Sequence, residues 1–451
     1  MNDITAFFAF LKYCLGYKEN MSRMIAGMNW HELYSFASKQ ALLGLCFEGI
    51  ERLGEEYPEE LRLNPIGREL LMTWMGKAQQ IRRQNRKVNI VASKLFSMLR
   101  EDRMRCCVLK GQGNALMYPN PYSRTPGDID VWIHASRERI SEYASKMFEL
   151  EDDIRLQHLE TSLNGVPVES HFFPCSMNNP IYHARLQKWF RRNADLQCSH
   201  IVGLPDGAGD IAIPTTAFNV IYQLTHLYHH FFDEGIGMRQ IIDYFLVVND
   251  FSKNVFLNND LSNHPVPLSK EGSTFSPSPS SSGSGDVTAP SRCSEPLRSK
   301  DGGPSKVSPD CAGWDRLAIE GDNSAGSTTV VTSSASTALV VVQRELKHLG
   351  LWKFAGAVMY VLHEALGLSD GKMIAPMDEK RGKLLLAEIL NGGNFGQHFT
   401  KYGHFTQQGM AKKYFLKIWR NMHFVRYYPA EALSEPIFRT WHFFWRLKHR
   451  R

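Results

Sequence analysis

The feature that most constrains the fold of this chain is a stretch in which acidic and apolar residues alternate, Asp128-Ile129-Asp130-Val131. Alternation with a period of two is the signature of a β-strand whose two faces differ. Residues i and i+2 of a strand point the same way, with Cα atoms roughly 6.6 Å apart. We therefore expect the two carboxylates to lie on one face of a strand.

Two further short segments have β character, whereas most of the remaining chain has helical patterns. Cys106–Leu109 is a short apolar run, and Val166–Phe172 alternates again. Between them, Ser136 can cap a helix that runs to about Leu150. These patterns predict an α+β fold, in which a small mixed β-sheet core is embedded in a largely helical protein.

Composition divides the chain into five regions. We expect helical regions at 1–102, 206–257 and 338–451, and a catalytic-type core that contains the strands at 103–205. Residues 258–337 are rich in Ser, Pro, Gly and Thr, so they cannot bury enough apolar surface to offset the entropy of ordering. We predict a long disordered insertion there, with the helices on either side free to pack together.

Length and charge set broad limits. A chain of 451 residues can form two or three domains. The net charge of +6 is mild, so it permits a basic groove without favouring a dedicated nucleic-acid binder. The N-terminus lacks the basic region of a signal peptide, no uncharged stretch reaches membrane-spanning length, and the eight cysteines include no CxxC pair. We therefore expect a cytoplasmic protein.

Two carboxylates on one strand face call for a cation between them. At about 4 Å and an effective dielectric near 20, their repulsion costs roughly 4 kcal/mol. Mg²⁺ or Mn²⁺ suits the position, because these ions prefer oxygen ligands and keep positions open for phosphate. Asp128 and Asp130 are thus candidate metal ligands.

Glu169 is the best candidate for a third ligand. It lies in the middle of the alternating segment, on the face opposite Val166 and Val168. A triad of this kind can hold two divalent ions about 3.5–4 Å apart, around the attacking and leaving oxygens of an in-line displacement. Glu160, Asp152 and Asp153 are competitors in less strand-like surroundings.

The turn Lys110-Gly111-Gln112-Gly113, upstream of the acidic strand, suits a phosphate group. Glycines let the backbone approach closely, and N–H groups at the start of a helix expected over Asn114–Tyr118 would point at the phosphate. Lys110 and Arg124 would add positive charge for a triphosphate. Each also has a structural interpretation, Lys110 as a solvated strand end and Arg124 as the partner of an acid.

Several of these motifs together resemble a known family. They are Leu109-Lys110-Gly111, Tyr118-Pro119, Arg124, Asp128-Ile129-Asp130 and Val168-Glu169-Ser170-His171, with further likeness at His226, Gly237–Asp243 and Gly392–Gly396. The chain resembles the uncharacterised nucleotidyltransferase family of the DNA polymerase beta-like superfamily.

The resemblance implies roles for the acids. Asp128 and Asp130 would bind both metal ions, and Glu169 would join at the catalytic one and help to deprotonate the acceptor hydroxyl. The turn departs from the usual pattern, because Gln112 follows Gly111 where superfamily members carry serine or a second glycine. How the phosphates are held is therefore open, and Lys110 could compensate.

The expected activity is metal-dependent transfer of a nucleoside monophosphate from a nucleoside triphosphate, ATP included, to a hydroxyl of an unknown acceptor, with release of pyrophosphate. One alternative is a glycosyltransferase that holds Mn²⁺ and a sugar nucleotide through Asp-x-Asp. Another is a non-catalytic nucleotide- or partner-binding module, which Gln112 favours. Nucleic acid is a possible partner that the mild charge does not favour.

Four other features keep a structural interpretation beside a functional one. The cluster His226, His229, His230 and Asp233 has helical metal-ligand spacing, but its two i, i+4 pairs point in different directions. The basic run Arg82–Lys87 is expected to be a solvated helix face. Gly392–Gly396 could be a second phosphate loop or a turn between helices. The aromatic, basic segment Trp441–Arg451 could contact a membrane surface, although packing on the helical region is favoured.

Overall fold

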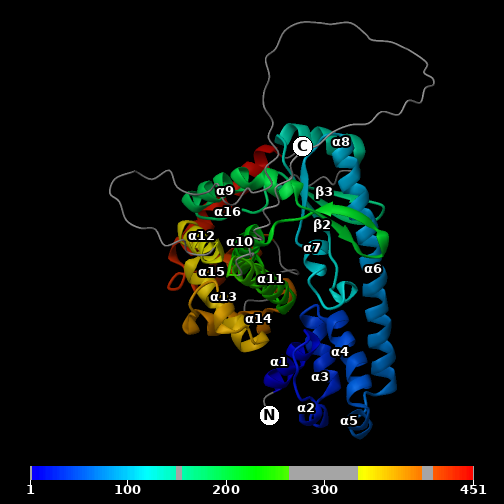
Figure 1. The fold of residues 1–451 in the computed structure, drawn as a ribbon. Helices are drawn as coiled ribbons and strands as arrows, with labels where there is room; N and C mark the ends of the chain where they lie inside the picture. The colour runs from blue at the N-terminus through cyan, green and yellow to red at the C-terminus, as the bar shows by residue number, and fades with distance from the viewer. Residues whose placement is uncertain (1–2, 149–154, 264–333, 399–409, 450–451) are drawn as a thin grey trace, which may run out of the picture. The chain divides into compact units, whose positions relative to one another are not determined.

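The computed structural model describes residues 3–148, 155–263, 334–398 and 410–449 (Figure 1). Most of these residues are helical, and they enclose a small mixed sheet, which confirms the α+β prediction. Residues 264–333, the greater part of the predicted insertion, lie outside the described residues. The helices α11 (Met238–Asn263) and α12 (Ser334–His348) enter the predicted range 258–337 from either side.

The sheet has four strands in the order β1–β2–β4–β3. The pair β1–β2 is antiparallel, β2–β4 is parallel and β3–β4 is antiparallel. The register places Asp130 beside Glu169, and His158 beside His171. Their bounds are β1 Cys106–Leu109, β2 Ile129–Ile133, β3 His158–Leu163 and β4 Val166–His171.

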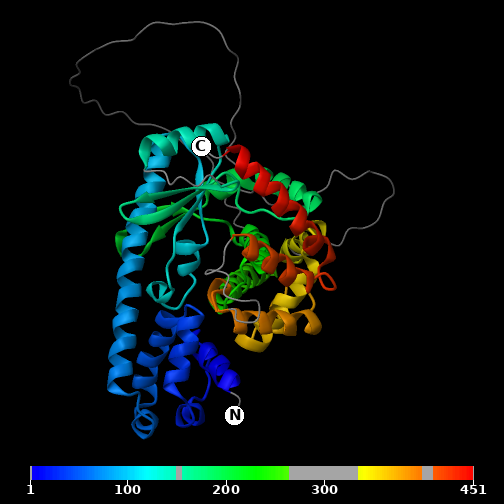
Figure 2. The ribbon, with the colours of Figure 1, turned by 180° about the vertical axis from the view of Figure 1, so that it is seen from behind.

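The two faces of the sheet pack against different helices. Ile129, Val131 and Ile133 belong to a core shared with the long helix α6 (Arg68–Glu101), which runs beside the sheet in both views (Figures 1 and 2). Trp132 faces the other way and stacks on Phe218 of α10 (Thr216–Asp233), with ring centroids 6.1 Å apart. Because β2 alternates, Asp130 lies on the α10 side.

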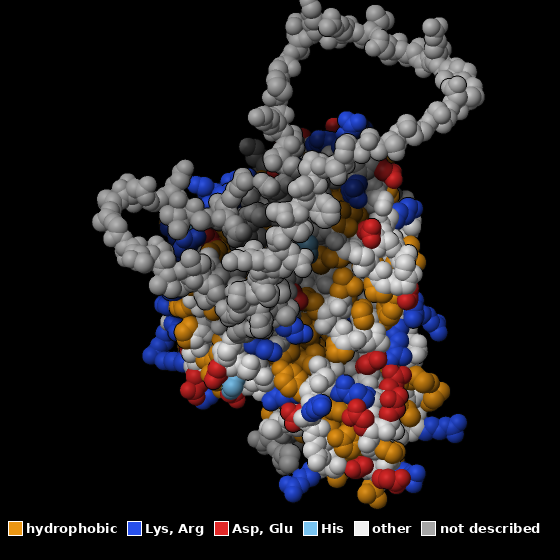
Figure 3. Space-filling model, in the orientation of Figure 1, with side chains coloured by type: hydrophobic (Ala, Val, Ile, Leu, Met, Phe, Trp, Pro, Cys, Tyr) orange, Lys and Arg blue, Asp and Glu red, His pale blue; other side chains and the backbone are white. Residues whose placement is uncertain are grey.

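The N-terminal helices pack against one another and on the N-terminal part of α6. Arg82 of α6 pairs with Glu48, at 2.8 Å, and with Glu51, so the basic run Arg82–Lys87 is partly neutralised. Acidic and basic side chains intermix over these helices in the lower part of Figure 3. The helices are α1 Asp3–Cys14, α2 Ser22–Ala26, α3 Trp30–Lys39, α4 Leu43–Glu56 and α5 Pro58–Leu63.

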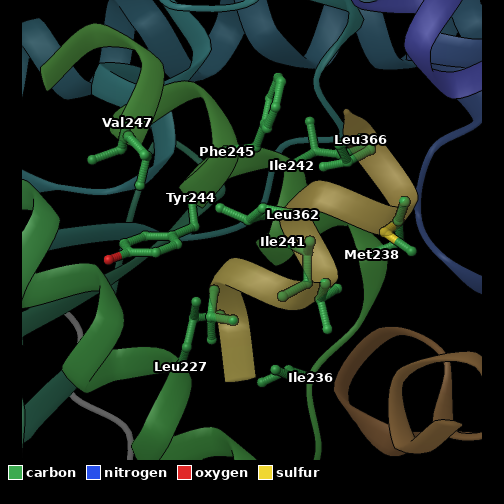
Figure 4. Packing of buried hydrophobic residues seen from close by; sticks show 14 of the residues in the cluster. Leu227, Ile236, Met238, Ile241, Ile242, Tyr244, Phe245, Val247, Leu362 and Leu366 are labelled. Carbon is green, nitrogen blue, oxygen red and sulfur yellow. The ribbon is translucent and has the colours of Figure 1, made fainter. Parts of the chain in front are cut away.

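A helical layer covers the acidic face of the sheet. The helix α9 (Pro180–Ser199) leads into a hairpin of β5 (Ile201–Leu204) and β6 (Gly209–Ala212), and α10 and α11 follow. Figure 4 shows the core between α10, α11 and α13 (Trp352–Leu366), where Ile241 and Tyr244 lie near Leu362. This packing anchors α10 and α11 on the side of the sheet that carries Asp130.

The C-terminal helices complete this layer. They are α14 Glu379–Gly392, α15 Met410–Met422 and α16 Pro429–His449. Glu431 of α16 is buried and accepts hydrogen bonds from the backbone N–H groups of Asn178, at 2.5 Å, and Asn179, at 3.2 Å. Farther along α16, Trp441 and Phe444 are exposed. None of the helices in the described parts of the chain is long and apolar enough to cross a membrane.

The structure corrects three sequence predictions. The helix expected at Asn114–Tyr118 is α7, Gly111–Ala115, because Lys110 itself reverses the chain with a positive φ of 51°. The strand β3 was missed, although Asn164 and Gly165, both with positive φ, join it to β4 in the manner of a tight hairpin turn. The hairpin β5–β6 was also missed, and β6 lies inside the region 206–257 that was expected to be helical.

The helix predicted after Ser136 is present as α8 (Arg137–Met147), and the Ser136 side chain accepts a hydrogen bond from the Arg139 N–H, at 3.3 Å. Asp152 and Asp153, two competitors for the third acidic position, lie outside the described residues. Glu160, the other competitor, lies on β3 beside Glu169 and pairs with Arg155 at 2.6 Å. It is therefore on a strand, contrary to the expectation from sequence.

Candidate functional site

The three carboxylates singled out from the sequence come together on one face of the sheet, at its two central strands β2 and β4. Asp128 immediately precedes β2, Asp130 lies within β2, and Glu169 lies beside Asp130 on β4. One oxygen from each of them lies within 4.8 Å of the other two. Asp130 is buried, Glu169 is half-buried and Asp128 is exposed, so the group opens to solvent at Asp128.

Two cationic side chains lie against these acids. The Lys110 ammonium is 3.0 Å from Asp130 Oδ1. The Nε2 atom of His171 is 2.9 Å from Asp130 Oδ1 and 3.2 Å from Glu169 Oε2. Lys110 also contacts α10, where His226 Nε2 lies 2.8 Å from the Lys110 Nζ atom.

The proximity of these groups shifts their pKa values. The negative charge of Asp130 is the main cause that raises the pKa of Asp128 to about 6. Burial alone would raise the pKa of Asp130, but Lys110 and His171 hold it well below its usual range. Burial would lower the pKa of His171, but hydrogen bonds to Asp130 and Glu169 raise it to about 9. At neutral pH three carboxylates therefore face two cations, leaving one net negative charge.

The predicted phosphate turn, Lys110–Gly113, reverses the chain at the start of α7. Lys110 has φ of 51° and Gly111 has φ of 37°, so the chain reverses sharply before the first turn of α7. A Cβ atom at Gly113 would come 3.0 Å from the Ile213 side chain, so this glycine allows close packing. Gln112 is buried and donates a hydrogen bond to Asn89 of α6. Strain of this kind at Lys110 is typical of functional sites.

Arg124 is engaged in a buried ion pair. It is 4% exposed, its Nε lies 2.9 Å from Oδ1 of Asp243, and its Nη2 lies 2.8 Å from Oδ2. The Tyr118 hydroxyl donates to the same carboxylate at 2.8 Å. The pair ties the loop before β2 to α11. These contacts agree with the structural interpretation of Arg124 as the partner of an acid.

A cavity of about 60 Å³ lies beside the acids, lined in part by Lys110, Asp128, Asp130 and Arg239. Pockets for whole drug-sized ligands span roughly 300–1,000 Å³. The cavity therefore has room for a metal ion and a few phosphate oxygens, while a nucleoside would extend beyond it.

Arg239, on α11, is a cation of this cavity that the sequence did not single out. Its Nη1 donates to the Thr125 carbonyl at 3.2 Å, and its Nε is buried with no hydrogen-bond partner among the described residues. The guanidinium lies over the ring of Phe395, 5.6 Å from the centroid. Arg239 therefore has an Nε donor that the described residues leave unpartnered, whereas the Nε and Nη2 of Arg124, which also lines this cavity, are bound to Asp243.

The segment Gly392–Gly396 helps to place Arg239. It ends α14, and Phe395 lines the small cavity. A Cβ atom at Gly237 would come 2.7 Å from the Asn394 Cα, so this glycine permits the loop before α11 to approach the end of α14. This segment therefore forms a turn at the end of α14 and also contributes Phe395 to the cavity wall.

A larger cavity of about 370 Å³ has His158 in its wall. Aromatic side chains and ion pairs line it, among them Phe173, Phe438 and the Asp233–Lys417 pair, whose atoms are 2.8 Å apart. His229 also borders this cavity, whereas His226 borders the small one and lies 3.1 Å from His230 Nε2. Among the described residues, no set of converging metal ligands includes these three histidines or Asp233.

Two histidines at the acidic cluster were missed as site residues. His171 could have been identified as a site residue from the sequence, because it follows Glu169 by two residues on the same strand and therefore shares its face. His158 needed the register of β3, which places it beside His171 with ring centroids 4.9 Å apart. Its Nδ1 lies 3.5 Å from Glu169 Oε2.

One comparison with known proteins agrees with the resemblance to the uncharacterised nucleotidyltransferase family. The model of a family described as uncharacterised nucleotidyltransferase matches residues 26–262, which include every acid and cation of the cluster. No curated protein matches the chain. A solved structure that matches is described as an antigenic nucleotidyltransferase-like protein from Paracoccidioides brasiliensis. It shares 16% identity, covers 39% of this chain and 85% of its own, and has a TM-score of 0.26, which is too low to carry an argument.

Proposed function

This chain belongs to the uncharacterised nucleotidyltransferase family, and from that premise we propose that it transfers a nucleoside monophosphate from a nucleoside triphosphate to a hydroxyl of an acceptor, releasing pyrophosphate. The observation that carries the proposal is the convergence of Asp128, Asp130 and Glu169 within 4.8 Å. Membership of the DNA polymerase beta-like superfamily remains a prediction from sequence.

The donor set fits Mg²⁺ or Mn²⁺. All three ligands are carboxylates, which hard divalent ions prefer, and the exposed side of Asp128 leaves room for further oxygen ligands. The net negative charge of the cluster at neutral pH also favours a cation. When bound, such an ion would neutralise phosphate charge and activate the attacking hydroxyl.

We assign the protein's own phosphate contacts to Lys110 and Arg239. Both line the small cavity beside Asp128 and Asp130, and Arg239 has an unpartnered Nε within the described part of the chain. Charge-assisted hydrogen bonds from these groups suit phosphate oxygens. We assign Arg124 to holding the loop before β2 in place, because its Nε and Nη2 are bound to Asp243. Gly111 shapes the turn, while Gln112 and Gly113 pack it.

We assign Glu169 to holding the metal rather than to accepting the proton of the acceptor. Burial would raise its pKa, but its hydrogen bond to His171 lowers it, which makes the carboxylate a weak base. The larger cavity is our choice for the acceptor, because His158 in its wall lies 3.5 Å from Glu169.

The test measures pyrophosphate release and the mass of labelled products after incubation with each nucleoside triphosphate, Mg²⁺ or Mn²⁺, and a cell extract as the source of acceptor. We expect Asp128→Asn and Asp130→Asn to lower the rate by about 100-fold or more while the protein stays folded. Asp195→Asn is the matched control, because Asp195 is exposed, lies outside the acidic cluster and pairs with Arg105 and His134 near the surface. Full activity in either cluster variant would end the proposal.

One observation favours a non-catalytic nucleotide-binding module. Lys110 and His171 already lie within 3.0 Å of Asp130, as in a stable ion network. Calorimetry separates the two functions: Mg²⁺-dependent triphosphate binding without product for any acceptor supports the module. A parallel incubation with labelled UDP-sugars tests the glycosyltransferase alternative, which predicts sugar transfer and no pyrophosphate.

A further inference from the structure

A second group of potential metal ligands shares Glu169 with the acidic cluster. It consists of His158, Glu169 and His171, and one ligand atom from each lies within 4.8 Å of the other two. Strand pairing builds it, because His158 on β3 lies directly beside His171 on β4, two residues from Glu169. Two imidazoles and a carboxylate differ chemically from the three carboxylates next to them.

His158 is the residue that points to a ligand. It is 8% exposed, and neither of its ring nitrogens makes a hydrogen bond to any described residue. Buried polar groups are almost always satisfied, and leaving one unpaired costs stability.

The spacing also suits a metal ion. Ligand atoms about 2.0–2.1 Å from a tetrahedral Zn²⁺ lie roughly 3.4 Å apart. The two measured separations are 3.5 Å, from His158 Nδ1 to Glu169 Oε2, and 3.2 Å, from His171 Nε2 to the same oxygen. The Nε2 atom of His171 also lies 2.9 Å from Asp130 Oδ1, so metal binding would displace the proton that His171 shares with these two carboxylates.

We propose that His158, Glu169 and His171 form a binding site for a first-row transition metal ion of the Zn²⁺ type, bridged through Glu169 to the site of the three carboxylates. Imidazole ligands select Zn²⁺, Fe²⁺ or Co²⁺ over Mg²⁺, which prefers oxygen. The chain thus offers two adjacent positions with different metal preferences. The site stands whether or not the protein transfers nucleotides, because its evidence is the donor set alone.

The test is calorimetric titration of the full chain, freed of metal, with Zn²⁺ in the presence of excess Mg²⁺. We expect one Zn²⁺ per chain at this site, and affinity at least tenfold lower in His158→Gln and in His171→Gln. Asp195→Asn should retain the Zn²⁺ affinity, because Asp195 lies outside both groups of ligands. His134→Gln is the matched histidine control, since His134 lies near the sheet but outside the group.

A measurement on the unaltered protein covers the case in which a histidine variant fails to fold. Crystals grown with Zn²⁺ should give an anomalous scattering peak between His158, Glu169 and His171. No Zn²⁺ bound in excess Mg²⁺, unchanged affinity in folded His158→Gln, or a zinc peak elsewhere would each overturn the proposal. Loss of nucleotidyl transfer alone would leave it intact.

Discussion

The buried pair of Arg124 and Asp243 allows a sharp prediction, because its two partners are 4% and 5% exposed and are joined by two hydrogen bonds of 2.9 and 2.8 Å. Asp243→Asn removes the negative charge and leaves the guanidinium buried without its counter-charge. Breaking a buried pair from one side costs about 3–5 kcal/mol. We expect about 3 kcal/mol of lost stability, since asparagine retains one acceptor oxygen for Arg124.

The assay is urea unfolding followed by tryptophan fluorescence and circular dichroism, evaluated where the two transitions coincide. Arg124→Met with Asp243→Leu removes both charges, and we expect the double variant to recover much of the loss of either single variant. Burial alone would raise the pKa of Asp243, but Arg124 lowers it. Its contribution is therefore complete above its ordinary pKa, about 3.9, and is lost only as the pH falls through the lower folded value. The cost of Asp243→Asn should then be constant between pH 5 and 8.

A different outcome would refute the structural role of Arg124. If Arg124 instead reached the triphosphate, Arg124→Lys would raise the KM for the nucleotide with little change in stability. A stability loss below about 1 kcal/mol in Asp243→Asn, comparable to that of a surface pair, would contradict the reasoning.

Three further predictions follow from single residues. Arg239→Gln should raise the KM for the triphosphate about tenfold or more and leave the fold intact, measured by steady-state kinetics; an unchanged KM would exclude the phosphate contact. Gly237→Ala should lower the melting temperature and the triphosphate affinity together, because its Cβ would come 2.7 Å from the Asn394 Cα; a variant with wild-type values of both would contradict the packing. Burial raises the pKa of Glu431 to about 7, so the folded state holds this proton more tightly than the unfolded state. The stability that Glu431 contributes is full below its ordinary pKa, about 4.3, and falls as the pH rises through 7. Between pH 5 and 8, urea unfolding should therefore show wild type losing stability relative to Glu431→Gln. Parallel curves of unfolding free energy against pH would contradict this.

Local patterns in the sequence were sufficient for the sheet's central strands. The alternation in β2 and β4 follows directly from one face packing on α6 and the other carrying Asp130 and Glu169, so the period-two signal was strong. The strand β3 has a weaker pattern, and its best signal, the Asn164-Gly165 turn, was overlooked. The α+β class and the proximity of the three acids could thus be anticipated from local sequence.

Contacts between residues far apart in the chain could not be anticipated. Arg124 meets Asp243 across 119 positions, and Gln112 is tied to Asn89 of α6, so neither side chain is free in the way its position beside the motif suggested. Arg239 lines the cavity from α11, and Gly237 lets the loop before α11 approach the end of α14. A motif fixes which residue types are present, whereas packing decides which of them have donors to spare.

The central claim is that Asp128, Asp130 and Glu169 together hold a divalent cation beside a bound triphosphate. The most direct measurement is the anomalous scattering of crystals containing Mn²⁺ and a non-hydrolysable nucleoside triphosphate. We expect manganese between the three carboxylates, with phosphate oxygens near Lys110 and Arg239. Manganese absent from this position, or a triphosphate bound away from it, would contradict the account.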